Sequence, residues 1–372
     1  RQLDRLAMAR ARKKWFMAVG FRRPHTKFRA PARVTAARRA AGVEMPAWDE
    51  RWPPIDAAWP AHRPMCRDLL HSDEVRAVGF DGGPRPLDEA VTRQLRLGYF
   101  SCVEWVDELV GALMAHVDRA GFANDTLVVF TSDHGWELGE HAGWCKGTLH
   151  ERTLRVPLIV RDPRASRGAG AVERSVVQLV DLFPTMAELA GVPVPLARAK
   201  RLDGRSLAHL LRPGRPTPAA AREVLLRAPQ PAGMPWAFPA SAAFAVWPSC
   251  AAELAIGRRR QTECEACFRD GRQLPCADCE GSRCLRAPAP VRLMGLAIKT
   301  DAFRYVEWRA VGAASPAAVD WSAAGLEAVE LFDHRADRRE RANVAADPAL
   351  AADRARLAAN LRARFVQCEA AP

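Results

Sequence analysis

The chain has 372 residues, of which 49% are hydrophobic and 26% charged, a balance typical of about two folded domains rather than a disordered chain. No uninterrupted apolar run is long enough to cross a bilayer, which argues against a membrane-spanning segment, and no signal-peptide pattern follows Arg1. The net charge of +12 comes from residues 1–40, which hold thirteen Lys or Arg and one Asp, so the remainder is nearly neutral. This basic region favours polyanions, although an arginine-rich surface without a ligand explains it equally well. Nucleic acid is the least favoured polyanion, because no helix-turn-helix, RRM or zinc-finger pattern accompanies the charge.

The first predicted elements are a strand, an irregular excursion and a helix. Residues 15–19 form a short apolar run, WFMAV, that predicts a buried strand ended by Gly20. Residues 30–88 are rich in Pro, Trp and Arg without periodicity, which indicates a long surface excursion. Residues 91–120 predict an amphipathic helix with one apolar face, formed by Val103, Val106, Val110, Leu113 and Val117.

Two short strands and a helix are predicted next. A strand is expected over residues 127–131, and a second apolar strand begins at Val156. Residues 176–190 are strand-like and then helical, with Pro184 suited to an early helix position.

The C-terminal part follows a Pro/Ala-rich linker at residues 213–239. Its sequence predicts β-strands and then a closing helix, at residues 293–299, 303–311, 329–333 and 348–365. We therefore expect three parts: residues 1–212 as an α/β catalytic domain, 213–290 as linker and cysteine-rich insertion, and 291–372 as a small subdomain.

The most informative segment is Thr126–Val160. Its apolar, β-branched run ends at Ser132-Asp133-His134-Gly135, and a Gly/His-rich loop carrying Lys146 follows. Open α/β sheets place ligands and catalytic groups at the carboxyl ends of their strands. Asp133 offers the hard oxygen donor that Ca²⁺ prefers, and the ammonium of Lys146 suits a point contact to a tetrahedral anion.

Five segments resemble, in order, the sulfatases of the alkaline-phosphatase superfamily, and most closely the iduronate-2-sulfatase subgroup. They are WFMAVGFRRPH, YFSCVEWVDELVGAL, the SDHGWELGEHAGWCK block continuing to RVPLIV, MGLAIKTDAFRYVEW and ELFDHRADRRERANVA. The resemblance implies an α/β fold: an alkaline-phosphatase-like sandwich of a mostly parallel sheet between helices, whose first strands are missing. A small C-terminal subdomain with an antiparallel sheet and a terminal helix completes the expectation.

The resemblance also implies a reaction and a site. Sulfatases hydrolyse sulfate esters, here expected to be those of sulfated sugars, with a formylglycine nucleophile beside a divalent cation that is usually Ca²⁺. Asp133 and His134 match metal ligands, and for the histidine nitrogen the resemblance alone supports that role. Lys146 matches the lysine that grips a sulfate oxygen, and His25 matches the histidine near the leaving-group oxygen. Without the resemblance, the same residues are a solvated turn, a surface lysine and a structural histidine beside a proline.

The family's nucleophile motif, Cys or Ser followed by x-Pro-x-Arg, does not occur in the sequence. The first-strand metal ligands are also expected to precede the region where this sequence begins. We therefore expect the chain by itself to be an inactive fragment of a sulfatase. Two other readings stay open: a sulfatase-like protein that only binds polyanions, and a phosphodiesterase or phosphonate hydrolase of the same superfamily.

Six of the ten cysteines crowd into one polar segment: Cys250, Cys264, Cys267, Cys276, Cys279 and Cys284. Two CxxC pairs suggest a zinc knuckle, although the linker between them is shorter than the common pattern. Disulfides are the preferred interpretation, because sulfatases usually reside in the secretory pathway. A sequon at Asn124-Asp125-Thr126 is compatible with a lysosomal or extracellular location. Oligomeric state has no signal in the sequence.

Overall fold

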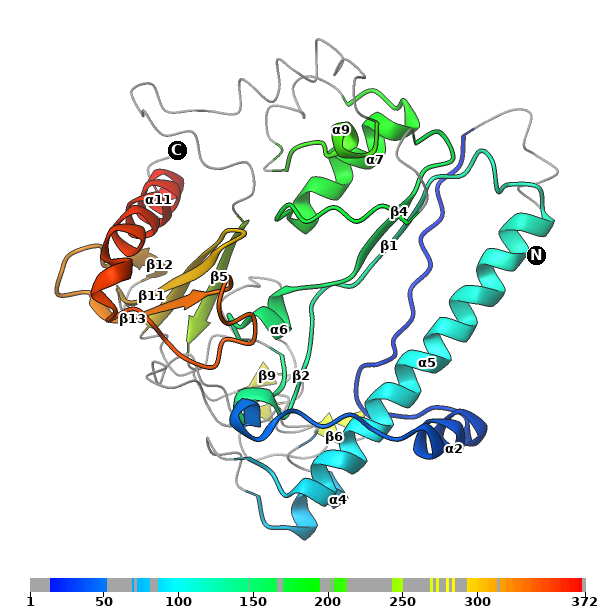
Figure 1. Cartoon of the computed structure of the whole chain (residues 1–372), viewed down its shortest axis with the longest axis horizontal. Helices are drawn as coiled ribbons and strands as arrows, with labels where there is room; N and C mark the ends of the chain where they lie inside the picture. The colour runs from blue at the N-terminus through cyan, green and yellow to red at the C-terminus, as the bar shows by residue number, and fades with distance from the viewer. Residues whose placement is uncertain are drawn as a thin grey trace. The chain divides into compact units, whose positions relative to one another are not determined.

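The computed structural model describes residues 14–51, 69, 72–80, 86–146, 148–165, 170–194, 202, 204–212, 243–249, 268–269, 272–273, 279–280, 283–284, 293–312 and 315–369 (Figure 1). The chain forms two compact units. Unit 1 comprises Arg1–Pro54, Arg63–Lys146 and His150–Ser241, and unit 2 comprises Ile55–His62, Gly147–Leu149 and Ala242–Pro372. The predicted linker at 213–239 lies outside the described residues, as does most of the cysteine-rich segment, so the three-part division stays a prediction.

The longest helix of unit 1 is α5 (Glu89–Arg119), which confirms the helix predicted at 91–120. Asp88 caps its first turn, because the side-chain Oδ1 accepts hydrogen bonds from the amides of Ala90 and Val91. Its buried stripe includes Leu95, Cys102 and Val117, whereas the predicted face residue Val103 is exposed. Of the other predicted face residues, Val117 is buried and Val106, Val110 and Leu113 are half-buried, so the predicted apolar face is confirmed except at Val103. No described helix is both long and apolar enough to span a bilayer.

Helix α2 (Ala32–Ala41) was not predicted, because it lies in the segment read as irregular. It buries only Val34, so it has almost no apolar periodicity. Two ion pairs attach it to α5: Arg33 binds Glu108 in a bidentate fork, with nitrogen–oxygen distances of 2.7 and 2.5 Å, and Arg38 binds Glu104. Short helical segments η1 (Trp48–Arg51) and α4 (Asp73–Ala77) occupy the same region.

The strand predicted at residues 15–19 is wrong. These residues are extended but pair with no described strand, and Phe16 is 80% exposed. Trp15 instead packs its indole edge-to-face on Phe122, with ring centroids 5.3 Å apart. The run therefore buries alternate side chains against the end of α5 rather than forming a sheet core.

Strand β1 (Val128–Thr131) pairs antiparallel with β4 (Leu158–Arg161), which confirms both predicted strands. Between them lie a small hairpin and a helical turn: β2 (Glu137–Leu138), η3 (Glu140–Ala142), β3 (Trp144–Cys145) and α6 (Glu151–Leu154). The segment at 176–190 contains the expected helix, as η4 (Leu179–Asp181) and α7 (Leu182–Ala190), but no strand precedes it in the described part of that segment. Helix α9 (Ala208–Leu211) is the last described element of unit 1.

Unit 2 is built on one antiparallel sheet, as expected for the C-terminal subdomain. Its strands are β5 (Ala243–Ser249), β10 (Leu293–Lys299), β11 (Phe303–Gly312), β12 (Ser315–Val319) and β13 (Leu326–Asp333). The order is β12-β11-β10-β5, and β13 also pairs with β11. After the turn η7 (Pro348–Leu350), helix α11 (Ala351–Glu369) lies beside this sheet (Figure 1). Its Leu357 and Leu361 join the buried apolar cluster of the sheet. Two short hairpins, β6–β7 (Phe268–Arg269, Arg272–Gln273) and β8–β9 (Cys279–Glu280, Arg283–Cys284), come from the cysteine-rich segment.

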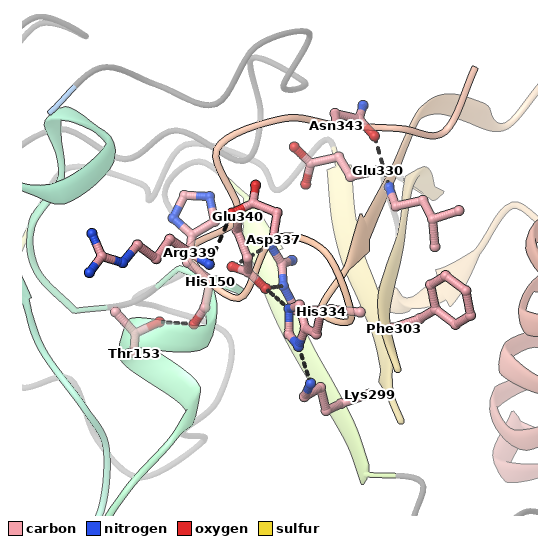
Figure 2. Close-up of polar contacts among 12 residues, drawn as sticks. His150, Thr153, Lys299, Phe303, Glu330, His334, Asp337, Arg339, Glu340 and Asn343 are labelled. Carbon is pink, nitrogen blue, oxygen red and sulfur yellow. Dashed lines mark hydrogen bonds and ion pairs between the residues drawn. The ribbon is translucent and has the colours of Figure 1, made fainter. Parts of the chain in front are cut away.

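A buried polar cluster lies at the start of β11 in unit 2 (Figure 2). Arg304 Nε and Nη2 donate to the two carboxylate oxygens of Glu340 at 2.6 and 2.9 Å, and both side chains are fully buried. His334 Nε2 lies 2.7 Å from Oε1 of the same carboxylate, and Lys299 Nζ contacts His334 Nδ1. Burial alone would raise the pKa of Glu340, but Arg304 and His334 outweigh it and hold that pKa well below its usual value.

Candidate active site

The loop after β1 carries Asp133 and His134 and lies tightly against α6. The amide of Gly135 donates to the carbonyl of Thr153 at 2.8 Å, and the amide of Trp136 donates to the carbonyl of Arg152 at 3.0 Å. A Cβ at Gly135 would stand 2.1 Å from the Arg152 carbonyl oxygen, so only glycine permits this approach. The two hydrogen bonds therefore fix the backbone immediately after the predicted metal ligands.

Asp133, His134 and Lys146 meet at one atom, the Nε2 of His134. His134 Nδ1 lies 2.8 Å from the Gly135 carbonyl oxygen, so Nδ1 carries the proton and donates it there. Nε2 is then the acceptor, and the Lys146 ammonium donates to it at 2.8 Å. The Asp133 Oδ2 atom lies 3.4 Å from the same nitrogen. The structure thus brings together three of the four residues that the sequence singled out.

His25 reaches this region through the indole of Trp136. The ring centroids of His25 and Trp136 are 6.0 Å apart, and those of His134 and Trp136 are 6.2 Å apart. His25 Nδ1 lies 2.9 Å from the Thr26 carbonyl oxygen and donates to it, which leaves Nε2 as the acceptor nitrogen. Phe28 and Tyr99 pack on the same indole, with centroid distances of 6.2 Å each. Sequence reasoning missed this role of Trp136, although the residue stands within the SDHGW motif.

Lys146 follows a hairpin that is held firmly in place. Strands β2 and β3 pair Glu137 with Cys145 and Leu138 with Trp144. Arg96 of α5 donates to the Leu138 carbonyl at 2.9 Å and to Glu140 Oε1 at 3.1 Å, and the Leu138 amide donates to Glu140 Oε2 at 2.7 Å.

The same hairpin is reinforced by charge and by covalent chemistry. Burial would raise the pKa of Glu140, but Arg96 and the Leu138 amide outweigh it, so that pKa is lowered and the carboxylate stays ionised. Cys145 is disulfide-bonded and Cys102 is a free, buried thiol. The lysine is therefore presented by a covalently and electrostatically anchored loop.

The predicted calcium ligands do not complete a site within the described residues. Asp133 and His134 supply one carboxylate and one imidazole, whereas Ca²⁺ takes about six to eight oxygen ligands. The Asp133 side chain is 84% exposed, and neither residue joins a described group of three potential ligands. In unit 1 such a group is formed instead by Glu137, His141 and His150.

The fold of the chain is alkaline-phosphatase-like. Solved structures with the same fold include a phosphonate monoester hydrolase from Silicibacter pomeroyi, with a TM-score of 0.59 at 24% identity, covering 98% of this chain and 59% of that one. A protein solved with its substrate D-glucosamine-2-N,6-O-disulfate gives a TM-score of 0.59 at 18% identity, covering 98% of this chain and 69% of that one. These likenesses confirm the predicted fold class.

The sequence defines the family more narrowly. A family model for sulfatases matches residues 2–192, just over half of the chain. The iduronate 2-sulfatase of Homo sapiens is 32% identical over 209 residues, which cover 49% of this chain and 36% of that enzyme. A multifunctional alkaline phosphatase superfamily protein of Trinickia caryophylli is 33% identical over 209 residues, covering 55% and 39% respectively. The chain belongs to the sulfatase family, whose members are hydrolases and generally depend on a metal, and it spans well under half the length of these curated relatives.

Proposed function

We propose that this chain carries part of the active site of a sulfuric ester hydrolase of the iduronate-2-sulfatase type, acting on sulfate esters of sulfated sugars. The observation that supports the proposal is the convergence of Asp133 Oδ2 and Lys146 Nζ on His134 Nε2, at 3.4 and 2.8 Å. A carboxylate, an imidazole and an ammonium at one point provide both a partial metal-binding pair and an anion contact.

We assign each residue a role in that chemistry. Asp133 and His134 would contribute two ligands to a Ca²⁺ ion, for which His134 Nε2 would give up its contact with Lys146. The ion would offset negative charge on the sulfate oxygens. Lys146 contacts a sulfate oxygen as a point charge. His25 stands near the leaving-group oxygen and exchanges a proton with it through Nε2.

The nucleophile is the remaining requirement. The formylglycine motif is not among these 372 residues, so we propose that they do not hydrolyse sulfate esters unless the nucleophile is supplied with them. The disulfide at Cys145 supports passage through the secretory pathway, with a lysosomal or extracellular destination.

The test uses the protein as its own cells make it, recovered through an affinity tag on the endogenous protein. Peptide mass spectrometry asks for a formylglycine peptide, and activity is measured on iduronate 2-sulfate and on an aryl sulfate with and without Ca²⁺. Lys146→Met should lower kcat/KM by at least about 100-fold, because an anion contact at the reacting group is lost. His209→Gln, at an exposed position on α9, is the matched control and should leave activity unchanged. Sulfate hydrolysis that survives Lys146→Met would refute the assigned role.

A hydrolase of phosphonate or phosphate esters is the second candidate. It is favoured by the likeness to the multifunctional superfamily protein of Trinickia caryophylli. The same preparation is assayed on a phosphonate monoester and a phosphodiester. A kcat/KM higher on these substrates than on the sulfate esters would favour the phosphonate or phosphate ester hydrolase, and the reverse would favour the sulfatase.

A polyanion-binding protein without catalysis is the third reading, and the structure weakens one part of its basis. Arg33 and Arg38, two of the basic residues near the N-terminus, are engaged by Glu108 and Glu104 of the same unit. Retention on heparin without hydrolysis by the full-length cellular protein would favour this reading.

A further inference from the structure

A second polar cluster in unit 1 lies in the hairpin that presents Lys146. Glu137 comes from β2, His141 from η3 and His150 from the residue before α6. Their exposed fractions are 1%, 2% and 3%, so all three side chains are buried. None of them is a residue to which the sulfatase resemblance assigns metal binding or substrate contact.

The three side chains present their ligand atoms to one another. One ligand atom from each lies within 4.8 Å of the other two. His150 Nδ1 lies 2.7 Å from Glu137 Oε1, and the His141 and His150 rings meet edge-to-face, with centroids 4.7 Å apart. Two imidazoles and one carboxylate form a donor set typical of zinc and other divalent transition metals, not of calcium.

We propose that Glu137, His141 and His150 bind a zinc ion that ties the hairpin to the start of α6. Two ligands of one tetrahedral zinc stand about 3.3 Å apart when each bond is about 2.0 to 2.1 Å. The 2.7 Å contact between His150 and Glu137 is therefore the metal-free arrangement, in which a proton occupies the space between nitrogen and oxygen. Binding of zinc displaces that proton to solvent and lengthens the distance between the two atoms by about 0.6 Å.

The backbone around the cluster is shaped to hold these side chains. His141 and Ala142 both adopt left-handed conformations, with φ of 56° each, which L-residues rarely do. A Cβ at Gly143 would stand 2.3 Å from Glu137 Oε2, so glycine is what leaves room for the carboxylate. Thr153 Oγ1 donates to the His150 carbonyl at 3.1 Å, which fixes the residue that carries the imidazole (Figure 2).

The neighbouring carboxylate of Glu140 has partners other than the proposed zinc ion. The carboxylate of Glu140 is already engaged by Arg96 at 3.1 Å and by the Leu138 amide at 2.7 Å. Glu137 is thus the carboxylate directed to the histidines, and its charge together with a divalent cation leaves a single positive charge in the cluster. Because the ligands are buried, exchange of a bound ion with chelator should be slow.

The experiment loads the full chain with Zn²⁺ alone, dialyses it and measures the metal by mass spectrometry. His150→Gln is compared with His209→Gln, which removes an exposed histidine and leaves the cluster intact. We expect His150→Gln to bind about one equivalent less than the parent chain, and His209→Gln to match the parent. Zn²⁺ should also raise the Tm of the parent and of His209→Gln but not of His150→Gln.

Two further measurements keep the inference falsifiable. Glu137→Gln preserves side-chain shape and should lose the same equivalent even if His150→Gln fails to fold. Substitution by Co²⁺ separates this site from the cysteines at 250–284, because thiolate ligands add intense near-ultraviolet charge-transfer bands that a nitrogen and oxygen site lacks. Equal metal content in the parent and in Glu137→Gln, or a cobalt spectrum of thiolate type that the substitution leaves unchanged, would overturn the proposal.

Discussion

Gly135 is the position at which a single methyl group should disturb the candidate active site most. In Gly135→Ala the new Cβ would stand 2.1 Å from the Arg152 carbonyl oxygen and 2.9 Å from that of Arg155, both backbone atoms that cannot rotate away. The loop must retreat, which breaks or weakens the hydrogen bonds that the amides of Gly135 and Trp136 donate to the carbonyls of Thr153 and Arg152. At about 1 kcal/mol for each hydrogen bond, the local cost is about 2 kcal/mol.

Gly111 provides the matched control within the same unit. It lies exposed on α5, and a Cβ there meets no atom within 4 Å. Gly111→Ala should therefore stabilise the helix by up to about 1 kcal/mol, so the same substitution has opposite signs at the two glycines.

Amide hydrogen exchange is the suitable assay, because it reports local opening rather than one unfolding transition of a two-unit chain. In Gly135→Ala the protection of the Trp136 amide should fall by about 30-fold, the equivalent of about 2 kcal/mol. Unchanged protection at Trp136, with the loop otherwise native, would show that the glycine is not what holds Asp133 and His134 in place.

Three further predictions concern buried charge. Arg304→Met leaves the carboxylate of Glu340 buried without its arginine and should lower the free energy of unfolding by about 3 to 5 kcal/mol, seen as a lower unfolding midpoint in urea. The double variant Arg304→Met/Glu340→Leu should recover most of that stability. The pKa values of Glu340 and Glu140 are lowered in the folded chain, so the stability that these ionised carboxylates contribute is present above about pH 4.5 and is lost as the pH falls. A Tm that does not change between about pH 6 and pH 3 would contradict this. Of the only two tyrosines, Tyr305 is buried and Tyr99 is half-buried, and burial raises the pKa of Tyr99 to about 12 and also raises that of Tyr305. Tyrosinate absorbance should therefore be absent at about pH 10 and should appear only as the chain unfolds at higher pH.

The sequence predicted best those elements whose side chains repeat with a regular period. Helix α5 has an N-cap and apolar spacing, β10 is an apolar run, and β11 and β13 are rich in aromatic and aliphatic residues, so their existence and order were predicted correctly. Helix α2 lacks such a pattern, because ion pairs to Glu104 and Glu108 stabilise it more than burial does. Pairing partners more than sixty residues away are not visible in a local window of sequence.

The strand predicted at 15–19 failed for a related reason. A short apolar run is compatible with a buried strand, but whether it becomes one depends on a neighbouring strand to which it can bond. In the described residues the run meets the end of α5 instead, where Trp15 packs on Phe122. Composition could identify the run as partly buried, but it could not identify the surface that buries it.

In the candidate site, too, the residues close together in sequence were predicted together, whereas the distant one was not. Asp133, His134 and Lys146 stand within fourteen residues of one another in a recognisable block, and the structure joins them at His134 Nε2. Their meeting depends on the Gly135 carbonyl, because the bond it accepts from Nδ1 selects the tautomer whose Nε2 lone pair faces the lysine. His25 lies more than a hundred residues earlier, and it approaches His134 through the indole of Trp136, which both imidazole rings contact. The family resemblance could suggest this position, whereas sequence spacing could not. The indole of Trp136, which has no catalytic chemistry of its own, thus connects His25 to the loop that carries His134.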